Sequence, residues 1–375
     1  MKKILSMLMV AFMLAGTLAG CASPSASADV TPDAAATPEP AAPTASAIAP
    51  SSDSSGAEVV TQQTANIETT PTGPNLYEGG NKPIVCLLMA KSTSPYSGAY
   101  FRMFKDLAPV YPDAEWVAFD AQSDATLQAQ QADEAVAMGA SLIMVQPVDN
   151  MAFVSSAKKI NEKGIYLVVC NTALDPSGDA YTTAFFGPDC YVEGQLAADM
   201  CHDAGMDGKA YVHLGQNDSN STGRLRRLGF EDRNAEMGYG FVKLEESPDC
   251  DFSVEKAKGH MATFLTKYSG KIDFVYAIDD GGAYGALQAI QDDVTGQNAH
   301  IKIASAAGGQ EPNLNALKNT DNMIGLIYQG PRVEITGAME FVHDILQGNM
   351  PVNKNNCMSL PIVTKENADQ YEAAY

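Results

Sequence analysis

From residue 83 onward, short apolar runs alternate with segments in which apolar residues recur every three or four positions. Short apolar runs predict buried β-strands, whereas the longer periodicity predicts amphipathic helices. Helical spacing is found around residues 101–108, 129–136 and 153–160. The strands predicted in this first half are Ile84–Met89, Glu115–Phe119, Leu142–Gln146 and Ile165–Cys170.

The same rhythm resumes after a break at Gly187-Pro188, and its clearest helix is Arg332–Leu346. The strands predicted in this second half are Lys209–Leu214, Phe241–Leu244, Ile272–Ile278, Lys302–Ser305 and Ile324–Tyr328. Strands that alternate with helices of this length predict parallel sheets covered by helices on both faces. We therefore expect an α/β protein of two Rossmann-like lobes with a cleft between them.

The first twenty residues have the pattern of a signal peptide. Lys2 and Lys3 precede an apolar run that extends to Leu18 and is too short to cross a bilayer as a mature helix. The run ends in Leu-Ala-Gly-Cys at residues 18–21, which resembles the bacterial lipobox. We expect cleavage before Cys21 and lipidation of that cysteine, so that the lipid is the protein's only contact with the membrane.

Residues 21–80 differ in composition from the rest of the chain. They are rich in Ala, Pro, Ser and Thr and contain few large apolar residues. Such a segment buries too little apolar surface to offset chain entropy. We expect a disordered linker that joins the lipid anchor to the folded domains.

The formal net charge of −21 becomes −23 once Lys2 and Lys3 leave with the signal peptide. A surface this acidic repels nucleic acid, so DNA and RNA are not expected partners. Six cysteines remain after Cys21, at spacings that suggest neither a compact disulfide framework nor a metal site, and whether they pair stays open. They are Cys86, Cys170, Cys190, Cys201, Cys250 and Cys357.

Ligands of open parallel sheets bind outside the carboxyl ends of the strands. Here that rule selects hydrogen-bonding side chains and an aromatic ring, a mixture that suits carbohydrate hydroxyls and their apolar C–H faces. The positions selected are Ser94-Pro95-Tyr96, Gln146, Asn171, residues 216–224, Asp279 and Gln329.

Signatures of enzymes are weak. The five histidines include no His-x-x-x-His pair, and the chain has no Cys-x-x-Cys, Gly-x-Ser-x-Gly or P-loop motif. Asp279-Asp280 suggests one pocket carboxylate and one helix cap rather than the two opposed carboxylates of a glycosidase. We therefore expect no catalytic residues, no cofactor and no bound metal.

From about Pro83 to Pro361 the chain resembles the periplasmic sugar-binding proteins of type I fold, the group of the ribose-binding and galactose/glucose-binding proteins. The resemblance rests on the order and spacing of residues 119–150, 173–199 and 277–290, on Arg224 followed by Gly229-Phe230, and on the sequence IYQGP at residues 327–331. No single stretch is decisive, but their order and spacing over nearly the whole domain region make the match specific.

The resemblance implies a role for several residues. Tyr96, in the Ser94-Pro95-Tyr96 turn, matches the aromatic residue that stacks on the sugar from the N-terminal lobe, and Phe252 matches the aromatic residue on the opposite face. Arg224 matches the arginine that donates two hydrogen bonds to ligand oxygens, as its planar fork allows. The remaining matches are polar ligand-binding positions: Gln146, Asn171, Asp279 and Gln329.

The chain also departs from the family. Ala307 stands where the family usually carries a pocket aspartate, so the hydroxyl pattern recognised must differ, with Asp279 as a compensating carboxylate. The calcium loop of the galactose/glucose branch is missing, because the segment Gly205-Met206-Asp207-Gly208 is too short.

The resemblance implies a hinge of three crossings near Gly187, Gln329 and Val352. The N-terminal lobe then comprises residues 81–187 and 330–352, and the C-terminal lobe comprises residues 188–329 and 353–375. The implied function is that of a monomeric, extracytoplasmic solute-binding lipoprotein of an ABC importer, with a sugar as ligand and an ABC permease as partner. A sensory receptor of the same fold for a sugar, nucleoside or signal molecule is the alternative, and a lipoprotein glycosidase is disfavoured.

Overall fold

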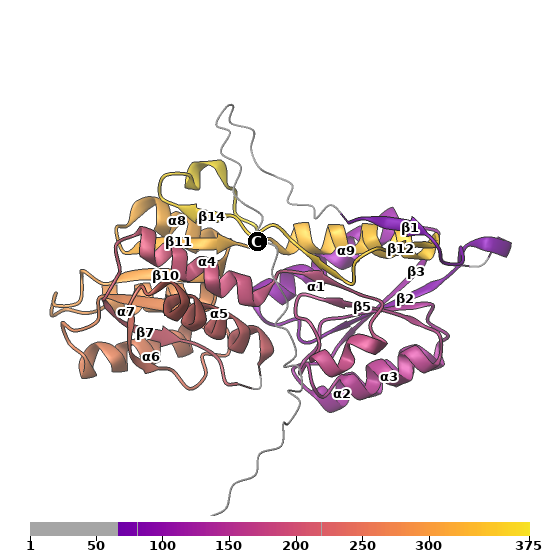
Figure 1. Cartoon of the computed structure of the whole chain (residues 1–375), viewed down its shortest axis with the longest axis horizontal. Coiled ribbons are helices and arrows are strands. Elements are labelled where there is room, and N and C mark those ends of the chain that lie inside the picture. The colour runs from indigo at the N-terminus through magenta and orange to yellow at the C-terminus, as the bar shows by residue number, and fades with distance from the viewer. Residues whose placement is uncertain (1–66, 81, 219) are drawn as a thin grey trace, which may run out of the picture. The chain divides into compact units, whose positions relative to one another are not determined.

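The computed structural model describes residues 67–80, 82–218 and 220–375. The expected signal peptide, Cys21 and the linker up to residue 66 lie outside the described residues. Residues 82–375 form two six-stranded sheets, each covered by helices on both faces (Figure 1). This confirms the expected α/β architecture of two lobes.

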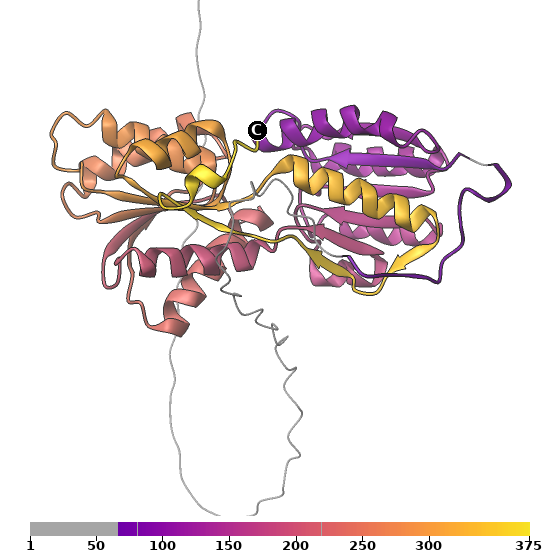
Figure 2. The same ribbon diagram turned by 90° about the horizontal axis from the view of Figure 1, so that it is seen from above.

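The sheet of the N-terminal lobe has the strand order β13-β6-β5-β4-β2-β3, and every neighbouring pair is parallel. Helices α1 and α9 lie side by side on one face, and α2 and α3 cover the other (Figures 1 and 2). The strands are β2 (Ile84–Met89), β3 (Glu115–Asp120), β4 (Leu142–Val145), β5 (Tyr166–Cys170), β6 (Ala184–Gly187) and β13 (Asn355–Cys357). The helices are α1 (Pro95–Leu107), α2 (Ala125–Ala137), α3 (Val154–Glu162) and α9 (Pro331–Leu346), with 3₁₀ turns η2 (Ala108–Val110) and η3 (Pro176–Tyr181).

The sheet of the C-terminal lobe has the order β14-β11-β10-β9-β7-β8 and is parallel except for the edge strand β14. Helices α4 and α5 pack on one face, and α6, α7 and α8 pack on the other. The strands are β7 (Ala210–Leu214), β8 (Val242–Glu246), β9 (Phe274–Ala277), β10 (Lys302–Gly308), β11 (Met323–Tyr328) and β14 (Ile362–Thr364). The helices are α4 (Cys190–Asp203), α5 (Ser221–Met237), α6 (Val254–Lys267), α7 (Asp280–Gln291) and α8 (Glu311–Asn319), followed near the end by η4 (Ala368–Gln370).

The chain passes between the lobes three times. The first crossing follows β6 at residues 188–189, and the second lies between β11 and α9 at residues 329–330. The third was expected near Val352 but lies at residues 358–361, because β13 still pairs with β6 in the N-terminal lobe. The backbone N–H of Met358 donates to Gly187 O at 2.9 Å, and that of Tyr328 donates to Pro361 O at 2.8 Å. Residues 353–357 thus belong to the N-terminal lobe, not to the C-terminal lobe as expected.

The linker was expected to extend to residue 80, but ordered structure begins earlier. Strand β1 (Thr69–Pro71) pairs with β12 (Asn349–Pro351), and η1 (Glu78–Gly80) follows it. Ile67, Leu76 and Tyr77 pack against the core on the α1/α9 face. These three apolar side chains supply buried surface. The average composition of the whole segment, which is dominated by small and polar residues, did not indicate it.

The six cysteines of the described residues are free thiols, of which only Cys357 is exposed. Burial raises the pKa of Cys86 to about 11. Cysteines of this kind behave as small apolar core residues. Within residues 67–375 as described, no helix combines the length and apolar character that a bilayer crossing needs.

Candidate functional site

A cavity of about 280 Å³ lies where the carboxyl ends of the two parallel sheets meet. Each of its main lining segments follows a strand, from β2 and β4 in the N-terminal lobe to β7, β9 and β11 in the C-terminal lobe. This is the position that the fold favours for a ligand. The polar lining residues are Lys91, Ser94, Tyr96, Ser97, Ser123, Gln146, Asn171, Thr172, Gln216, Asn217, Asn220, Thr222, Arg226, Asp249, Asp251, Asp279, Asp280, Gln310, Gln329 and Tyr375.

The structure brings together seven of the eight expected binding residues. The seven lining residues are Ser94, Tyr96, Gln146, Asn171, Phe252, Asp279 and Gln329. They come from both lobes and from the second crossing. Placement at the ends of parallel strands is therefore a strong sequence signal for this cavity.

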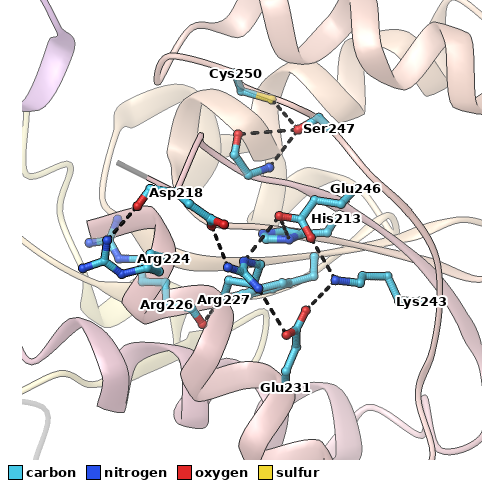
Figure 3. Close-up of polar contacts among 12 residues, drawn as sticks. His213, Asp218, Arg224, Arg226, Arg227, Glu231, Lys243, Glu246, Ser247 and Cys250 are labelled. Atoms are coloured by element: carbon cyan, nitrogen blue, oxygen red, sulfur yellow. Dashed lines mark hydrogen bonds and ion pairs between the residues drawn. The ribbon is translucent and has the colours of Figure 1, made fainter. Parts of the chain in front are cut away.

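Arg224 does not line the cavity, and Arg226 does. The Nη1 of Arg224 donates to Asp218 O at 2.6 Å on an exposed part of the lobe (Figure 3). The structure does not bring Arg224 to the cavity with Arg226, because neighbouring helical residues turn by about 100° per residue. Thr222 and Arg226 are four residues apart on α5 and share its cavity face. Helical spacing from Thr222 was the signal that would have identified Arg226.

Arg226 is held by three partners inside the protein. Its Nε donates to Glu193 Oε2 at 2.7 Å, Nη1 donates to Ile278 O at 3.0 Å, and Nη2 donates to Gln329 Oε1 at 3.1 Å. Arg226 is 4 % exposed and Glu193 is fully buried. The guanidinium is therefore fixed in position, with its charge compensated by a buried carboxylate.

Arg227, the third arginine of this turn, faces away from the cavity. It forms ion pairs with Asp218 at 2.6 Å, Glu231 at 3.4 Å and Glu246 at 3.4 Å (Figure 3). Lys243 joins the same cluster through Glu231 and Glu246. This cluster connects α5 to the outer strand of the sheet and takes no part in the cavity.

A chain of hydrogen bonds continues from Arg226 into the N-terminal lobe. Gln329 Nε2 donates to the Tyr96 hydroxyl at 3.1 Å, and that hydroxyl donates to Glu334 Oε2. Asn171 Nδ2 donates to the same oxygen at 3.2 Å. Burial raises the pKa of Glu334 to about 7, against the opposing effect of these donors.

Asp279 and Asp280 both line the cavity. Asp279 is also the N-cap of α7, because its carboxylate accepts from the backbone N–H groups of Gly281 and Gly282, each at 3.1 Å. From the sequence we expected the cap and the pocket carboxylate to be different residues of this pair. Burial raises the pKa of Asp280 to about 7, although its Oδ2 accepts from Gln310 N at 2.8 Å.

Three lining residues carry buried polar atoms that have no hydrogen-bond partner within the described residues. These atoms are Gln146 Oε1, Gln216 Nε2 and Asp280 Oδ1. An unpaired buried polar atom costs about 1–3 kcal/mol. Two acceptors and one donor at one cavity favour a ligand that both donates and accepts hydrogen bonds.

Backbone strain is concentrated at the same place. Among the described residues, five that are not glycine have positive φ, and four of those five line the cavity. The four are Ser123 (φ 65°), Asn171 (φ 63°), Asp251 (φ 48°) and Phe252 (φ 53°). Such conformations cost of order 1–3 kcal/mol each and are typical of binding and catalytic sites.

Sequence reasoning missed Lys91, Gln310 and Tyr375, which also line the cavity. Lys91 precedes the expected turn, Gln310 lies beyond the end of β10, and Tyr375 follows no strand of the sheet. Within the described residues, no group of three or more His, Cys, Asp or Glu side chains is arranged to hold a metal ion.

Comparison with known proteins agrees with this geometry. The profile of the periplasmic binding protein domain matches residues 84–350. The xylitol-binding protein of Mycolicibacterium smegmatis is 27% identical over 250 residues, which are 66% of this chain and 68% of that protein. The ribose import binding protein of Escherichia coli is 22% identical over 286 residues, which are 74% of this chain and 92% of that protein.

Solved structures show the same fold. An ABC transporter solute-binding protein from Bacillus halodurans with bound myo-inositol has a TM-score of 0.70 at 20% identity and covers 80% of this chain and 100% of its own. One from Mycobacterium smegmatis with bound glycerol has a TM-score of 0.68 at 22% identity, with 77% and 96% covered. The two parallel-sheet lobes match the type I arrangement of these proteins. With its profile match over most of its length, the chain belongs to the periplasmic binding protein family.

Proposed function

We propose that the protein is the extracytoplasmic solute-binding component of an ABC importer and that its cavity binds a neutral polyhydroxylated ligand, a sugar or a polyol. The observation that carries this proposal is the lining itself. Amides, hydroxyls and carboxylates from both lobes surround about 280 Å³ of space, and three of their buried polar atoms have no hydrogen-bond partner in the described part of the chain. Hydroxyl groups, which donate and accept, are the ligand chemistry that satisfies such a set.

The charges around the cavity support a neutral ligand. Arg226 is paired with Glu193 at 2.7 Å, and Lys91 is paired with Asp251 at 3.1 Å. Burial also raises the pKa of Asp279, which precedes Asp280 in the chain. Because both of these cations are compensated inside the protein, the described lining offers no free positive charge to an anionic ligand.

The relatives support the same ligand class. Their names and bound ligands include xylitol, ribose, myo-inositol and glycerol, all of which are uncharged and carry several hydroxyl groups. Tyr96 and Phe252 supply the aromatic rings that suit the C–H faces of such ligands. Closure of the lobes about the three crossings would bury the ligand and form the surface that the permease recognises.

Screening of sugars, linear polyols, inositols and nucleosides by thermal shift, followed by calorimetric titration, tests this function. A ligand at a hundred times its dissociation constant stabilises the folded protein by about 2.7 kcal/mol. Replacement of Phe252 with Ala removes buried ring area and should weaken binding by about 1–3 kcal/mol. Arg224→Ala is the matched control and should bind like the parent. Absence of stabilisation by every sugar and polyol would refute the proposal.

We also propose that Cys21 carries the lipid that retains the protein at the outer face of the membrane. The support is the Leu-Ala-Gly-Cys sequence at residues 18–21. In cells, the parent should fractionate with membranes, and Cys21→Ala should be released or retained as an unprocessed precursor. Replacement of the exposed Cys357 with Ala controls for loss of a thiol. A processed Cys21→Ala protein that stays with the membrane would contradict lipid anchoring.

A further inference from the structure

The segment that follows η4 returns across the C-terminal lobe to the cavity. The Tyr328 hydroxyl donates to Glu372 O at 2.9 Å, and Ala374 N donates to Gly309 O at 2.7 Å. The rings of Tyr328 and Tyr371 contact each other with centroids 5.0 Å apart. The chain is therefore fixed at both residues 372 and 374, immediately before Tyr375.

Gly309, directly after the end of β10, leaves room for this segment. A Cβ added to Gly309, whose φ is 147°, would lie 3.0 Å from Ala374 Cβ and 3.0 Å from Gln329 O. A larger residue at position 309 would therefore push the segment away from the lobe. The close approach of Ala374 to the backbone fixes the direction in which Tyr375 enters the cavity.

Tyr375 contacts both lobes from inside the cavity. Its hydroxyl donates to Asp280 Oδ2 at 3.2 Å and accepts from Gln310 Nε2 at 3.4 Å, both in the C-terminal lobe. Its ring meets Tyr96 of the N-terminal lobe edge-to-face, with centroids 5.5 Å apart at 88°. Burial and the Asp280 carboxylate raise the pKa of Tyr375 well above its usual value, so the hydroxyl stays a neutral donor.

We propose that Tyr375 is a specificity-determining wall of the cavity, which closes the side beside Asp280 and limits the site to a single sugar ring or a short polyol. This inference rests on the proposed function and adds a ligand size to it. The cavity of about 280 Å³ is measured with Tyr375 in place. It falls just below the roughly 300–1,000 Å³ of pockets that hold drug-sized ligands. Removal of the ring would extend the space towards Gln310.

Tyr375 also orients the carboxyl group of Asp280 for contact with the ligand. Tyr375 and Gln310 occupy Oδ2 of Asp280, whereas Oδ1 is buried and has no partner within the described residues. The hydroxyl of Tyr375 thus orients this carboxyl group so that one oxygen remains for a ligand hydroxyl. Tyr375 therefore affects affinity through its hydroxyl and size selection through its ring.

Two substitutions separate these effects. Calorimetric titration of the full chain uses monosaccharides, linear polyols, inositols, and disaccharides that contain the best-binding monosaccharide. The parent should bind a single-ring sugar or polyol and no disaccharide. Tyr375→Ala should bind that ligand at least tenfold more weakly and gain measurable disaccharide binding. Tyr375→Phe keeps the ring, so it should lose affinity only severalfold and still exclude disaccharides.

Glu372→Ala is the matched control, since it alters an exposed side chain of the same segment and keeps the carbonyl that Tyr328 contacts. It should bind like the parent, and thermal unfolding establishes that all variants are folded. The inference is overturned if Tyr375→Ala keeps the parent's affinity within twofold and still excludes disaccharides. Tighter binding by Tyr375→Ala also overturns it, because Tyr375 would then occupy the ligand's own place. A parent that binds no sugar or polyol refutes the proposed function and this inference with it.

Discussion

The side chain of Arg226 lines the cavity and also contacts the core of the C-terminal lobe and the second crossing. Each of its three donor nitrogens has its own acceptor, on Glu193, Ile278 and Gln329. The second oxygen of Glu193, Oε1, is buried and has no partner within the described residues. The pair is therefore sensitive to the loss of either member, because the charge left behind is buried.

Arg226→Ala is expected to reduce the free energy of unfolding by about 3–5 kcal/mol, since Glu193 loses its compensating charge. Adding Glu193→Gln to that variant should recover part of the loss. Arg224→Ala removes an exposed contact on the same helix and should stay within about 0.5 kcal/mol of the parent. Urea denaturation of the parent and the three variants measures these differences. If Arg224→Ala and Arg226→Ala lowered the free energy of unfolding equally, the buried Arg226–Glu193 pair would contribute no more to stability than an exposed contact.

Glu334 gives a pH-dependent contribution to stability. Its side chain is fully buried, and burial raises its pKa to about 7. The folded state thus binds the proton more tightly than the unfolded state, whose carboxyl has a pKa of about 4.3. The stabilisation that Glu334 contributes is therefore complete below about pH 4. It decreases as the pH rises towards 7, by about 1.4 kcal/mol per unit of difference between the folded and unfolded pKa values.

Glu334→Gln replaces the carboxyl with a group that does not titrate. At pH 4 we expect the variant and the parent to have similar stability, and at pH 8 we expect the variant to be more stable by up to a few kcal/mol, at about 1.4 kcal/mol per unit. The pKa of Asp280 is also raised to about 7, so Asp280 contributes the same pH dependence of stability to the parent and to the variant. Glu340→Gln, at an exposed site on the same helix, is the control. A difference that is identical at pH 4 and pH 8 would contradict the assignment.

Some residues of the candidate site could be predicted from the sequence, and others could not. Positions such as Gln146 and Asn171 were predictable because they directly follow strands, and the end of a parallel strand is defined by the hydrophobic pattern. To predict Arg226, it was necessary to know which face of α5 points to the cavity, and the two adjacent arginines left this ambiguous. Tyr375 was not predictable, because its place depends on the packing of Ala374 against Gly309 rather than on any local pattern.

At the scale of elements, α4 and α5 pack so closely that their backbones touch. A Cβ added to Gly229 would lie 2.0 Å from Tyr191 O, and one added to Gly194 would lie 2.1 Å from Arg226 O. These glycines allow Glu193 and Arg226 to meet between the two helices. The position of Arg226 at the cavity therefore depends on the closeness of this helix pair.

Gly229→Ala should consequently destabilise the protein by at least about 1–3 kcal/mol, because the added methyl group forces the helices apart. Gly259 is the matched control, since it lies inside α6 and a Cβ there would meet nothing within 4 Å. Gly259→Ala should stabilise the protein by up to about 1 kcal/mol, in line with helix propensity. Thermal and urea unfolding give both values, and a stabilising Gly229→Ala would rule out the backbone contact.

The elements differ in how well the sequence defined them. Long apolar strands such as β2 were predicted at their observed bounds, because hydrophobic runs alone determine them. β6 (Ala184–Gly187) was missed because it directly precedes the break at Pro188, and β13 (Asn355–Cys357) because it is short and largely polar. β13 exists through its pairing with β6, so only the tertiary structure reveals it and moves the third crossing beyond residue 357.

At the scale of the whole folded region, a small number of polar contacts connect the lobes at the mouth of the cavity. Lys91 Nζ in the N-terminal lobe pairs with Asp251 at 3.1 Å and lies 6.0 Å from the Phe252 ring centroid. The hydroxyls of Thr172 and Thr222 are 2.5 Å apart. These contacts exist only while the lobes are together, so they favour the closed arrangement in which a ligand is enclosed.

The Lys91–Asp251 pair can be separated from the other contacts of Asp251. Lys256 also pairs with Asp251, at 3.2 Å, but both of these residues belong to the C-terminal lobe. Asp251 is 51% exposed, so the interlobe pair should contribute no more than about 0.2–1 kcal/mol. Lys91→Met should therefore weaken ligand affinity by at most about fivefold, mainly through faster release. Lys256→Met removes a charge next to the same carboxylate and should leave affinity unchanged.

Salt dependence provides the second measurement. Screening at high ionic strength weakens an exposed ion pair, so added salt should lower the affinity of the parent towards that of Lys91→Met. The affinity of Lys91→Met itself should depend less on salt, because the interlobe pair is already absent. Small-angle scattering of the ligand-free proteins should show a larger mean radius for Lys91→Met than for the parent and Lys256→Met, since fewer molecules remain closed. If Lys91→Met and Lys256→Met alter affinity, its salt dependence and the radius equally, the effect arises from net charge and not from contact between the lobes.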